Sequence, residues 1–129
     1  MPADAIFYDP YSPAVNPEMW TVSAFEAVRS ALDPQRPCSL ATYSRSTMTR
    51  AALFAAGFYV GAGEPTGFKE ETTVAANAME LIERPLGREW LERVQRSGSA
   101  EPLWEPRYTQ APITPGTLER LKQHAQFRG

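Results

Sequence analysis

Residues 4–9 read Asp-Ala-Ile-Phe-Tyr-Asp, a short apolar run that ends in a carboxylate. Such a run predicts a buried parallel strand with Asp9 at its carboxyl tip, because strands covered on both faces carry nearly continuous apolar residues. Residues 10–17 follow at once and hold three prolines, which exclude a helix or a central strand there. A strand followed by a stiff loop is typical of the rim where an open α/β sheet binds its ligands.

The next part of the chain alternates between helix and strand patterns. Thr21 caps a predicted helix whose apolar residues recur at helical spacing from Val22 to about Leu32. Helices are predicted at 17–20, 21–32 and 48–56, and strands at 38–44, 58–60 and 71–76. This alternation predicts a parallel, doubly wound sheet. The last two strands lack a helix-sized linker, so we expect them to form an antiparallel hairpin at one end of the sheet.

The character of the chain changes after Asn77. One amphipathic helix is predicted from residue 87 to about 96, and a final helix starts at Thr114 and Pro115. A free linker would not need the aromatic residues that this part carries, such as Trp90 and Trp104. We therefore divide the chain into a sheet part, residues 1–77, and a helical and irregular C-terminal extension, residues 78–129, that packs on its outside.

Composition limits the classes of function. The 129 residues are 43% hydrophobic and carry a formal net charge of −2, which fits one globular domain without a global basic field. The single cysteine, Cys38, lies in an apolar run that predicts a buried thiol. One cysteine and one histidine, His124, are too few ligands to make a zinc site plausible. No signal peptide is visible, and no apolar run approaches the ~20 residues of a membrane span, so we expect a cytoplasmic protein without membrane partners.

The stretch at residues 9–13, Asp-Pro-Tyr-Ser-Pro, carries the clearest chemical signal. It resembles the Asp/Asn-Pro-Pro-Tyr/Phe signature of amino-group methyltransferases, in which the acidic or amide side chain holds the acceptor nitrogen toward the methyl donor. Transfer from a sulfonium needs alignment more than acid–base help. The alternative is that Asp9 only caps the loop that follows its strand.

A wider resemblance joins three separate segments. Residues 8–21 are similar to the Asp-x-Phe-x-Pro-x-x-Asn-Pro-x-x-Trp stretch of the MnmC methyltransferase family. Residues 40–44, with Arg50 and the Ala-Gly-Phe at 56–58, resemble the family's Leu-Ala-Thr-Tyr strand and the helix after it, and residues 69–71 stand where the family has Lys-Arg-Glu. The resemblance covers residues 3–77 and implies the C-terminal half of a Rossmann-like class I methyltransferase.

This family methylates the aminomethyl group of a modified wobble uridine in tRNA. The resemblance therefore implies S-adenosylmethionine as cofactor, no metal and tRNA as partner. It implies Asp9 as the catalytic residue, and it implies these substrate-binding residues: Pro10, Tyr11, Ser12, Asn16, Trp20, Tyr43 and Lys69. Trp20 has a second interpretation, a core tryptophan. Lys69 and Arg50 each have two interpretations, a contact with a phosphate group and an ordinary solvated position.

Two features of the family are missing from the sequence: the glycine-rich loop that approaches the cofactor and the acidic residue that binds its ribose. Glu70 also replaces a basic residue of the family segment. We therefore expect the isolated chain to bind S-adenosylmethionine weakly or not at all. We also expect a bare first sheet edge, which would pair with a cofactor-binding half or with a second copy.

Three interpretations stay open: a methyltransferase fragment, a non-catalytic binding module derived from that fold, and a different nucleotide-related α/β domain. The arginines of the C-terminal extension alternate with glutamates, which favours a solvated surface with ion pairs over an RNA track. These arginines are Arg84, Arg88, Arg93, Arg96 and Arg107.

Overall fold

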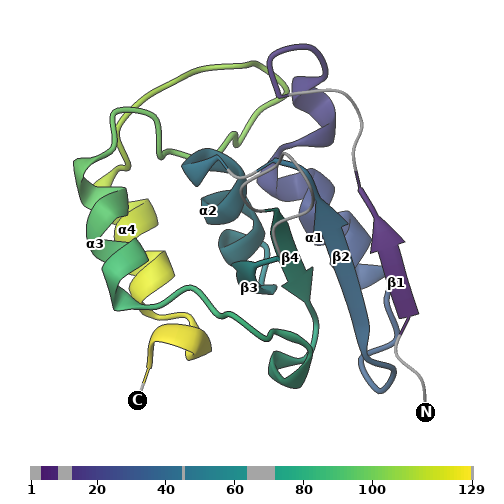
Figure 1. Ribbon diagram of the computed structural model, residues 1–129. Coiled ribbons are helices and arrows are strands. Elements are labelled where there is room, and N and C mark those ends of the chain that lie inside the picture. The colour runs from purple at the N-terminus through teal and green to yellow at the C-terminus, as the bar shows by residue number, and fades with distance from the viewer. Residues whose placement is uncertain (1–3, 9–12, 45, 64–71, 129) are drawn as a thin grey trace.

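The computed structural model describes residues 4–8, 13–44, 46–63 and 72–128. They form a mixed four-stranded sheet in the order β1-β2-β4-β3 (Figure 1). The strands are β1 (Asp4–Phe7), β2 (Cys38–Thr42), β3 (Tyr59–Ala62) and β4 (Thr73–Ala76).

Strand β4 gives the sheet its mixed character. β1 and β2 are parallel, whereas β4 is antiparallel to both β2 and β3. β4 therefore lies between β2 and β3 although it is the last strand in sequence order. The sequence pattern did not predict this interior position. Its residues Thr73 and Ala75 are fully buried, as an interior strand requires.

The helices begin where side-chain oxygens cap them. Thr21 accepts a hydrogen bond from the Ala24 amide at the start of α1 (Val22–Ser30), and Ser46 accepts one from the Thr49 amide at the start of α2 (Thr47–Ala55). The other helices are α3 (Arg88–Arg96), α4 (Pro115–Lys122) and the short 3-10 turns η1 (Pro17–Met19), η2 (Met79–Leu81) and η3 (Ala125–Phe127).

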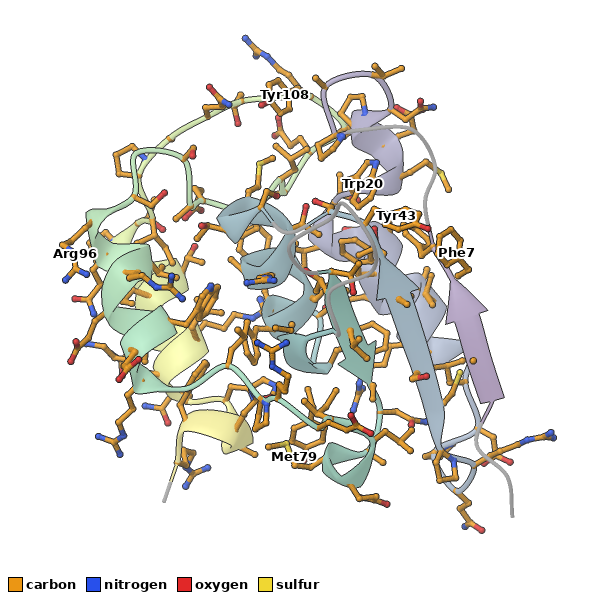
Figure 2. The ribbon with its side chains drawn as sticks, in the orientation of Figure 1. Phe7, Trp20, Tyr43, Met79, Arg96 and Tyr108 are labelled. Atoms are coloured by element: carbon orange, nitrogen blue, oxygen red, sulfur yellow. The ribbon has the colours of Figure 1, made fainter. Side chains whose placement is uncertain are left out.

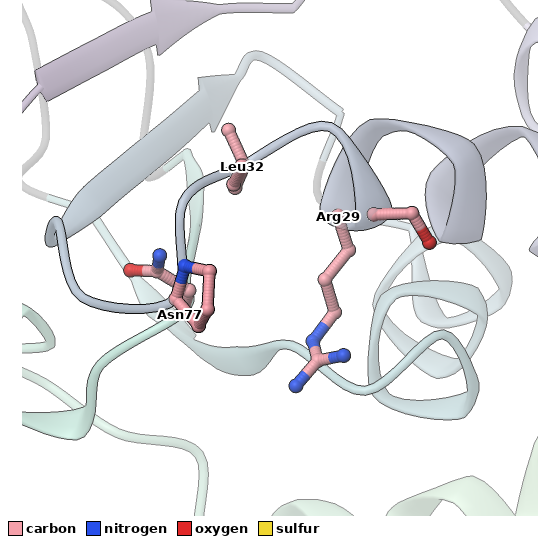
Figure 3. A pocket seen from close by; sticks show the side chains of 5 residues that line it. Arg29, Leu32 and Asn77 are labelled. Atoms are coloured by element: carbon pink, nitrogen blue, oxygen red, sulfur yellow. The ribbon is translucent and has the colours of Figure 1, made fainter.

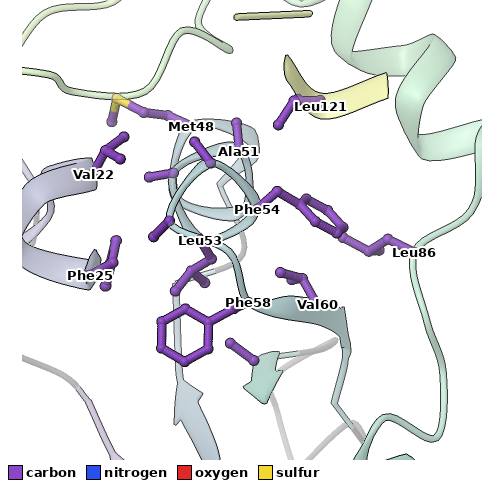
Figure 4. Packing of buried hydrophobic residues seen from close by; sticks show 14 of the residues in the cluster. Val22, Phe25, Met48, Ala51, Leu53, Phe54, Phe58, Val60, Leu86 and Leu121 are labelled. Atoms are coloured by element: carbon purple, nitrogen blue, oxygen red, sulfur yellow. The ribbon is translucent and has the colours of Figure 1, made fainter. Parts of the chain in front are cut away.

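Helix α2 lies at the centre of the core. All its residues from Met48 to Ala55 are buried, because α1 packs on one side and the C-terminal segments pack on the other (Figure 4). Trp90, Leu121 and Phe127 belong to the same apolar cluster as Phe25 of α1. The segment after residue 77 therefore shares one core with the sheet.

Among the described residues, no helix covers one face of the sheet near β1. In Figure 1, α1 lies behind β1 and β2, and no helix lies in front of them. Exposure alternates accordingly along β1, where Ala5 and Phe7 are exposed and Ile6 is half-buried. The predicted burial of this strand on both faces is therefore wrong for the described residues, and Phe7 is 64% exposed.

The two edges of the sheet also differ. Along β3, the segment around Pro85 forms a bridge with Gly61, the Ala62 amide donates to Arg84 O at 3.0 Å, and the Leu86 amide donates to Val60 O at 3.1 Å. Along β1, no described residue pairs on the side away from β2. Among the described residues, no helix is long and apolar enough to cross a membrane.

Candidate functional site

Tyr8 fixes the end of β1, immediately before the predicted catalytic loop. Its amide donates to Ala41 O at 2.7 Å, and its hydroxyl donates to the backbone carbonyl of Met19. Its ring meets those of Trp20 and Phe25 with centroid distances of 5.6 and 5.4 Å. Burial raises the pKa of the Tyr8 hydroxyl, so this group stays protonated and remains a donor. Both ends of the segment between Tyr8 and Met19 are thereby held together.

Asn16 and Trp20 lie on the far side of that segment. Asn16 precedes η1, its carbonyl accepts from the Met19 amide at 3.0 Å, and its side-chain amide donates to Glu18 Oε1 at 3.2 Å. Trp20 is only 2% exposed and packs edge to face against Tyr8 and Phe25. Its burial agrees with the core interpretation. In this structure its ring packs against Tyr8 and the core.

Phe7 and Tyr43 form an exposed aromatic pair at the carboxyl ends of β1 and β2. Their ring centroids are 5.2 Å apart and their planes meet at 77° (Figure 2). Phe7 is 64% and Tyr43 is 41% exposed. Exposed aromatic rings of this kind are the surfaces on which nucleic-acid bases stack.

A set of hydroxyl groups shapes the turn that carries Tyr43. The Ser44 amide donates to Thr42 Oγ1 at 3.2 Å, and the Ser44 hydroxyl donates to Thr49 Oγ1 at 3.0 Å. The Ser46 hydroxyl also donates to Thr49 Oγ1, at 2.8 Å. Thr42 and Thr49 are each 1% exposed, so the turn rests on buried groups. The position of the Tyr43 ring is thus set by β2 and the first turn of α2.

The structure describes only part of the predicted site. Asp9, Pro10, Tyr11, Ser12 and Lys69 lie outside the described residues. Asn16, Trp20 and Tyr43 are described. Tyr8 contacts Trp20 directly, and it is connected to Asn16 through Met19, whose amide donates to the Asn16 carbonyl.

Sequence reasoning missed Phe7 and Tyr8. Two consecutive aromatic residues at a strand end point to opposite faces of the sheet, so one meets the core and the other stays exposed. That signal was present in the sequence but was interpreted only as part of a buried strand.

Arg50 also departs from expectation. A solvated arginine was the alternative to a phosphate contact, but Arg50 is 4% exposed. Its Nε donates to Thr73 Oγ1 at 2.9 Å, and its Nη2 donates to Thr72 O at 3.2 Å. The solvated-surface interpretation of Arg50 is wrong because its guanidinium group is fixed against β4.

A separate hollow of about 240 Å³ lies beside the end of α1, lined by Arg29, Leu32 and Asn77 among others (Figure 3). The Asn77 amide is already used: Oδ1 accepts from the Cys38 amide at 2.8 Å, and Nδ2 donates to Asp33 O and Arg36 O at 3.4 and 3.1 Å. Asn77 therefore ties two loops together, and we assign no chemistry to this hollow.

The described residues that follow β1, β2 and β3 are Tyr8, Tyr43 with Ser44, and Gly63, and none of these is an acid. Asp9 and Glu64, which come next after Tyr8 and Gly63 in the sequence, lie outside the described residues. Within the described residues, no group of three or more histidine, cysteine, aspartate or glutamate side chains could hold a metal ion.

Comparison with known proteins identifies relatives. Residues 1–78 match the family described as S-adenosyl-L-methionine-dependent methyltransferase. The tRNA 5-methylaminomethyl-2-thiouridine biosynthesis bifunctional protein MnmC of Hahella chejuensis is 36% identical over 83 residues, or 64% of this chain and 13% of that protein. The MnmC of Ralstonia nicotianae is 32% identical over 106 residues, or 82% of this chain and 14% of that protein. This chain therefore spans about 13–14% of the length of these relatives.

A solved structure extends the likeness to the fold. The crystal structure of MNMC2 from Aquifex aeolicus superposes with a TM-score of 0.62 at 28% sequence identity. The match covers 93% of this chain and 38% of that chain. The mixed sheet and its helices, including most of the segment after residue 77, thus have a counterpart in a solved protein.

Proposed function

The chain belongs to the S-adenosyl-L-methionine-dependent methyltransferase family, and on that premise we propose that it carries the acceptor-binding part of an N-methyltransferase site. The observation that carries the proposal is the fixed end of β1, where Tyr8 bonds to Ala41 and Met19. Asp9 follows Tyr8 directly in the sequence. A rigid support on each side of the loop favours the alignment that methyl transfer requires.

The proposed acceptor is the aminomethyl group of a modified wobble uridine in tRNA. The names of the MnmC relatives refer to tRNA 5-methylaminomethyl-2-thiouridine biosynthesis, which supports this substrate class. The exposed Phe7–Tyr43 pair offers a ring surface at the same end of the sheet. Stacking of one base on an aromatic ring contributes about 1–3 kcal/mol, enough to orient a uridine beside the loop.

Asp9 is proposed to hold the amine of the acceptor. An aminomethyl group is largely protonated at neutral pH, and a carboxylate attracts it. The amine must lose that proton before it attacks, and Asp9 accepts it directly or through water. The methyl group comes from S-adenosylmethionine, the donor of this family.

The other residues are proposed to shape the acceptor pocket. Pro10, Tyr11 and Ser12 form the loop wall after Asp9, and Asn16 closes the loop at η1. Tyr43 lines the pocket from the tip of β2, and Trp20 acts from the core through its contact with Tyr8. Lys69 is proposed to meet a phosphate of the RNA.

We further propose that a second polypeptide segment supplies the cofactor site. The uncovered face and edge of β1 leave Phe7 exposed, and the MNMC2 chain is much longer than the part that matches here. That segment is either a cofactor-binding half or a second copy of this chain. The proposed organisation is a sheet part, residues 1–77, with residues 78–129 packed on its outside.

The test joins this chain to the cofactor-binding part of an MnmC relative and measures methyl transfer to aminomethyl-uridine tRNA. Asp9→Asn keeps the shape but removes the charge, so turnover is expected to fall at least ~10²-fold with folding unchanged. Asp33→Asn is the matched control, because Asp33 is an exposed aspartate that accepts from the Gln35 amide in a remote turn. Near wild-type turnover for Asp9→Asn would leave Asp9 as a loop cap only.

The alternative function is a non-catalytic binding module that pairs with another chain through β1. The exposed ring of Phe7, beside a strand edge that no described residue pairs, favours it. Calorimetric titration with S-adenosylmethionine separates the two. The joined protein should bind the cofactor and the chain alone should not. A joined protein that binds tRNA but neither binds cofactor nor methylates would support the module.

A further inference from the structure

The segment that joins α3 to α4 runs back toward η1. Figure 1 shows it leaving α3, reaching the end of the sheet where η1 lies and returning to α4. We call residues 101–114 of this segment the strap. We propose that Glu101, at the start of the strap, is a positioning residue for the acceptor loop between Tyr8 and Met19. The inference rests on the proposed function of that loop, and it extends the site beyond the family match, which ends at residue 78.

The Glu101 carboxylate closes the strap at its base. Its Oε1 accepts from the Thr114 amide at 2.9 Å, and its Oε2 accepts from the Thr117 hydroxyl at 2.9 Å and from the Trp104 indole N–H at 2.7 Å. The Glu101 amide also donates to Ala111 O at 3.0 Å. Hydrogen bonds to a carboxylate are roughly twice as strong as those between neutral groups. One side chain therefore joins both ends of the strap to the first turn of α4.

Leu103 connects the strap to the start of α1. Its carbonyl accepts from the Val22 amide at 2.9 Å, and it forms an isolated parallel bridge with Thr21. The Val22 amide is the first of α1, and the first amides of a helix have no acceptor within that helix. The strap supplies this acceptor away from water, because Leu103, Thr21 and Val22 are 2%, 5% and 1% exposed. The position of the helix start therefore depends on the strap.

The start of α1 is continuous with the support of the acceptor loop. Trp20 precedes Thr21 in the chain, and its ring packs against Tyr8 at a centroid distance of 5.6 Å. The Trp20 amide donates to Pro17 O at 3.0 Å, and the carbonyl of Met19 accepts from the Tyr8 hydroxyl. A shift of Thr21 therefore moves the residues that hold both ends of the loop.

Burial does not place the outer part of the strap. Residues 104–110 are exposed, and residues 104–112 do not belong to the apolar cluster of the core. The guanidinium carbon of Arg120 lies 5.3 Å from the centroid of the Trp104 ring, and the same ring donates to Glu101. Because apolar contacts are few here, the bonds to Glu101 determine the course of the strap.

The first measurement is amide hydrogen exchange of the 129-residue chain. Glu101→Ala removes all the bonds that the carboxylate accepts. The Trp20 and Val22 amides should then exchange at least about fivefold faster, the scale of one lost hydrogen bond. Glu101→Gln keeps one acceptor oxygen and should give a smaller increase, about twofold. Where Glu101→Ala does not fold, Glu101→Gln decides by the same comparison.

Two variants separate positioning from general stability. Glu105→Ala removes a carboxylate from the same strap, but Glu105 is exposed and its side chain makes no hydrogen bond or ion pair with a described residue. It should leave the exchange of the Val22 amide unchanged. Gln126→Ala removes the acceptor of the Val60 amide on β3. It should accelerate exchange at Val60 more than at Val22, whereas Glu101→Ala should do the reverse.

The second measurement is methyl transfer by the chain joined to the cofactor-binding part of an MnmC relative. Glu101→Ala is expected to lower kcat about tenfold, because displacement of a catalytic group by ~1 Å can cost up to ~10²-fold in rate. KM for S-adenosylmethionine should stay unchanged, since the other part of the joined protein supplies the cofactor site. Glu105→Ala, which removes the same charge, should keep the wild-type kcat.

Three results would overturn the proposal. The Val22 amide exchanges equally fast in Glu101→Ala and Glu105→Ala, or Gln126→Ala accelerates it as much as Glu101→Ala does, or an active joined protein keeps its kcat in Glu101→Ala. In the last case the strap contributes to stability alone. A wild-type joined protein without methyl transfer contradicts the proposed function instead, and the exchange rates still decide whether Glu101 holds the loop.

Discussion

The Nε2 atom of His124 lies 2.7 Å from the backbone carbonyl oxygen of Phe58, at the start of β3. The other ring nitrogen, Nδ1, accepts a hydrogen bond from the Gln126 amide at 3.0 Å. Nε2 therefore carries the proton and the ring is neutral, since Nδ1 must keep its lone pair. This imidazole joins the end of the chain to the sheet, and its protonation would remove one of the two bonds.

The first prediction concerns pH. Burial lowers the pKa of His124, and the nearby charge of Arg29 lowers it further, against the raising effect of the bond to Phe58. The unfolded state then binds the proton more readily than the folded state, so stability is fully present above the unfolded pKa of about 6.5. It is lost as the pH falls from there through the folded pKa. Urea unfolding at pH 8 and pH 5 should show this loss.

His124→Gln provides the comparison for that measurement. Glutamine does not titrate, so the part of the pH dependence that belongs to residue 124 should disappear in the variant. The same slope between pH 8 and pH 5 in both proteins would mean that other groups cause it.

The second prediction concerns Gln126, whose side chain replaces a strand along part of β3. Its Oε1 accepts from the Val60 amide at 2.9 Å, and its Nε2 donates to Val60 O at 2.7 Å and to Leu86 O at 2.9 Å. Gln126→Ala leaves the Val60 amide without this acceptor, so the free energy of unfolding should fall by about 1–3 kcal/mol. Gln123→Ala is the control, because Gln123 is exposed and its side chain donates to Glu119 Oε1 on the same turn of the chain, away from β3. Equal denaturation midpoints for the two variants would refute the role of Gln126.

Particular elements show why some features were predictable and others were not. The cap at Thr21 and the buried thiol of Cys38 follow from local rules, and they are present in the structure. The insertion of β4 between β2 and β3 follows from a pairing across more than thirty positions of the chain, which no local pattern encodes. A strand of small and β-branched residues fits equally well at an edge or in the interior.

The same limit applies to the candidate sites. The resemblance of residues 8–21 selected the loop after β1, but the closure of that loop depends on the Tyr8 hydroxyl and the carbonyl of Met19, eleven positions apart. The hollow beside the end of α1 also depends on segments that meet only in the fold, because residues 29–34 and Asn77 line it together. Motifs select residues near each other in sequence, whereas clusters of this kind depend on tertiary contacts.

The third prediction concerns association through β1. Phe7 is 64% exposed beside a strand edge that no described residue pairs, so at micromolar concentration the isolated chain should sediment as more than a monomer. Phe7→Lys places a charge on this surface and should shift the distribution toward monomer. Met79→Lys is the control, because Met79 is also exposed but lies on η2 at a different part of the surface (Figure 2). A wild-type chain that is monomeric at every concentration would contradict the prediction.

The last prediction concerns Tyr8 as a positioning residue. Tyr8→Phe keeps the ring against Trp20 and Phe25 but removes the hydroxyl that donates to Met19 O. The loop between them then loses the bond that closes it, and displacement of a catalytic group by ~1 Å can cost up to ~10²-fold in rate. In the joined enzyme we expect kcat for methyl transfer to fall about tenfold or more. KM for S-adenosylmethionine should stay unchanged, because the lost bond closes the proposed acceptor loop, whereas the other part of the joined protein binds the cofactor. The free energy of unfolding should fall by only ~1 kcal/mol, the usual contribution of one hydrogen bond.

Tyr59→Phe serves as the control. It removes a tyrosine hydroxyl that has no described hydrogen-bond partner, and its ring packs on His124 away from the loop. If Tyr8→Phe and Tyr59→Phe retain the same kcat, the bond to Met19 contributes to folding alone and the loop after β1 is held by other contacts.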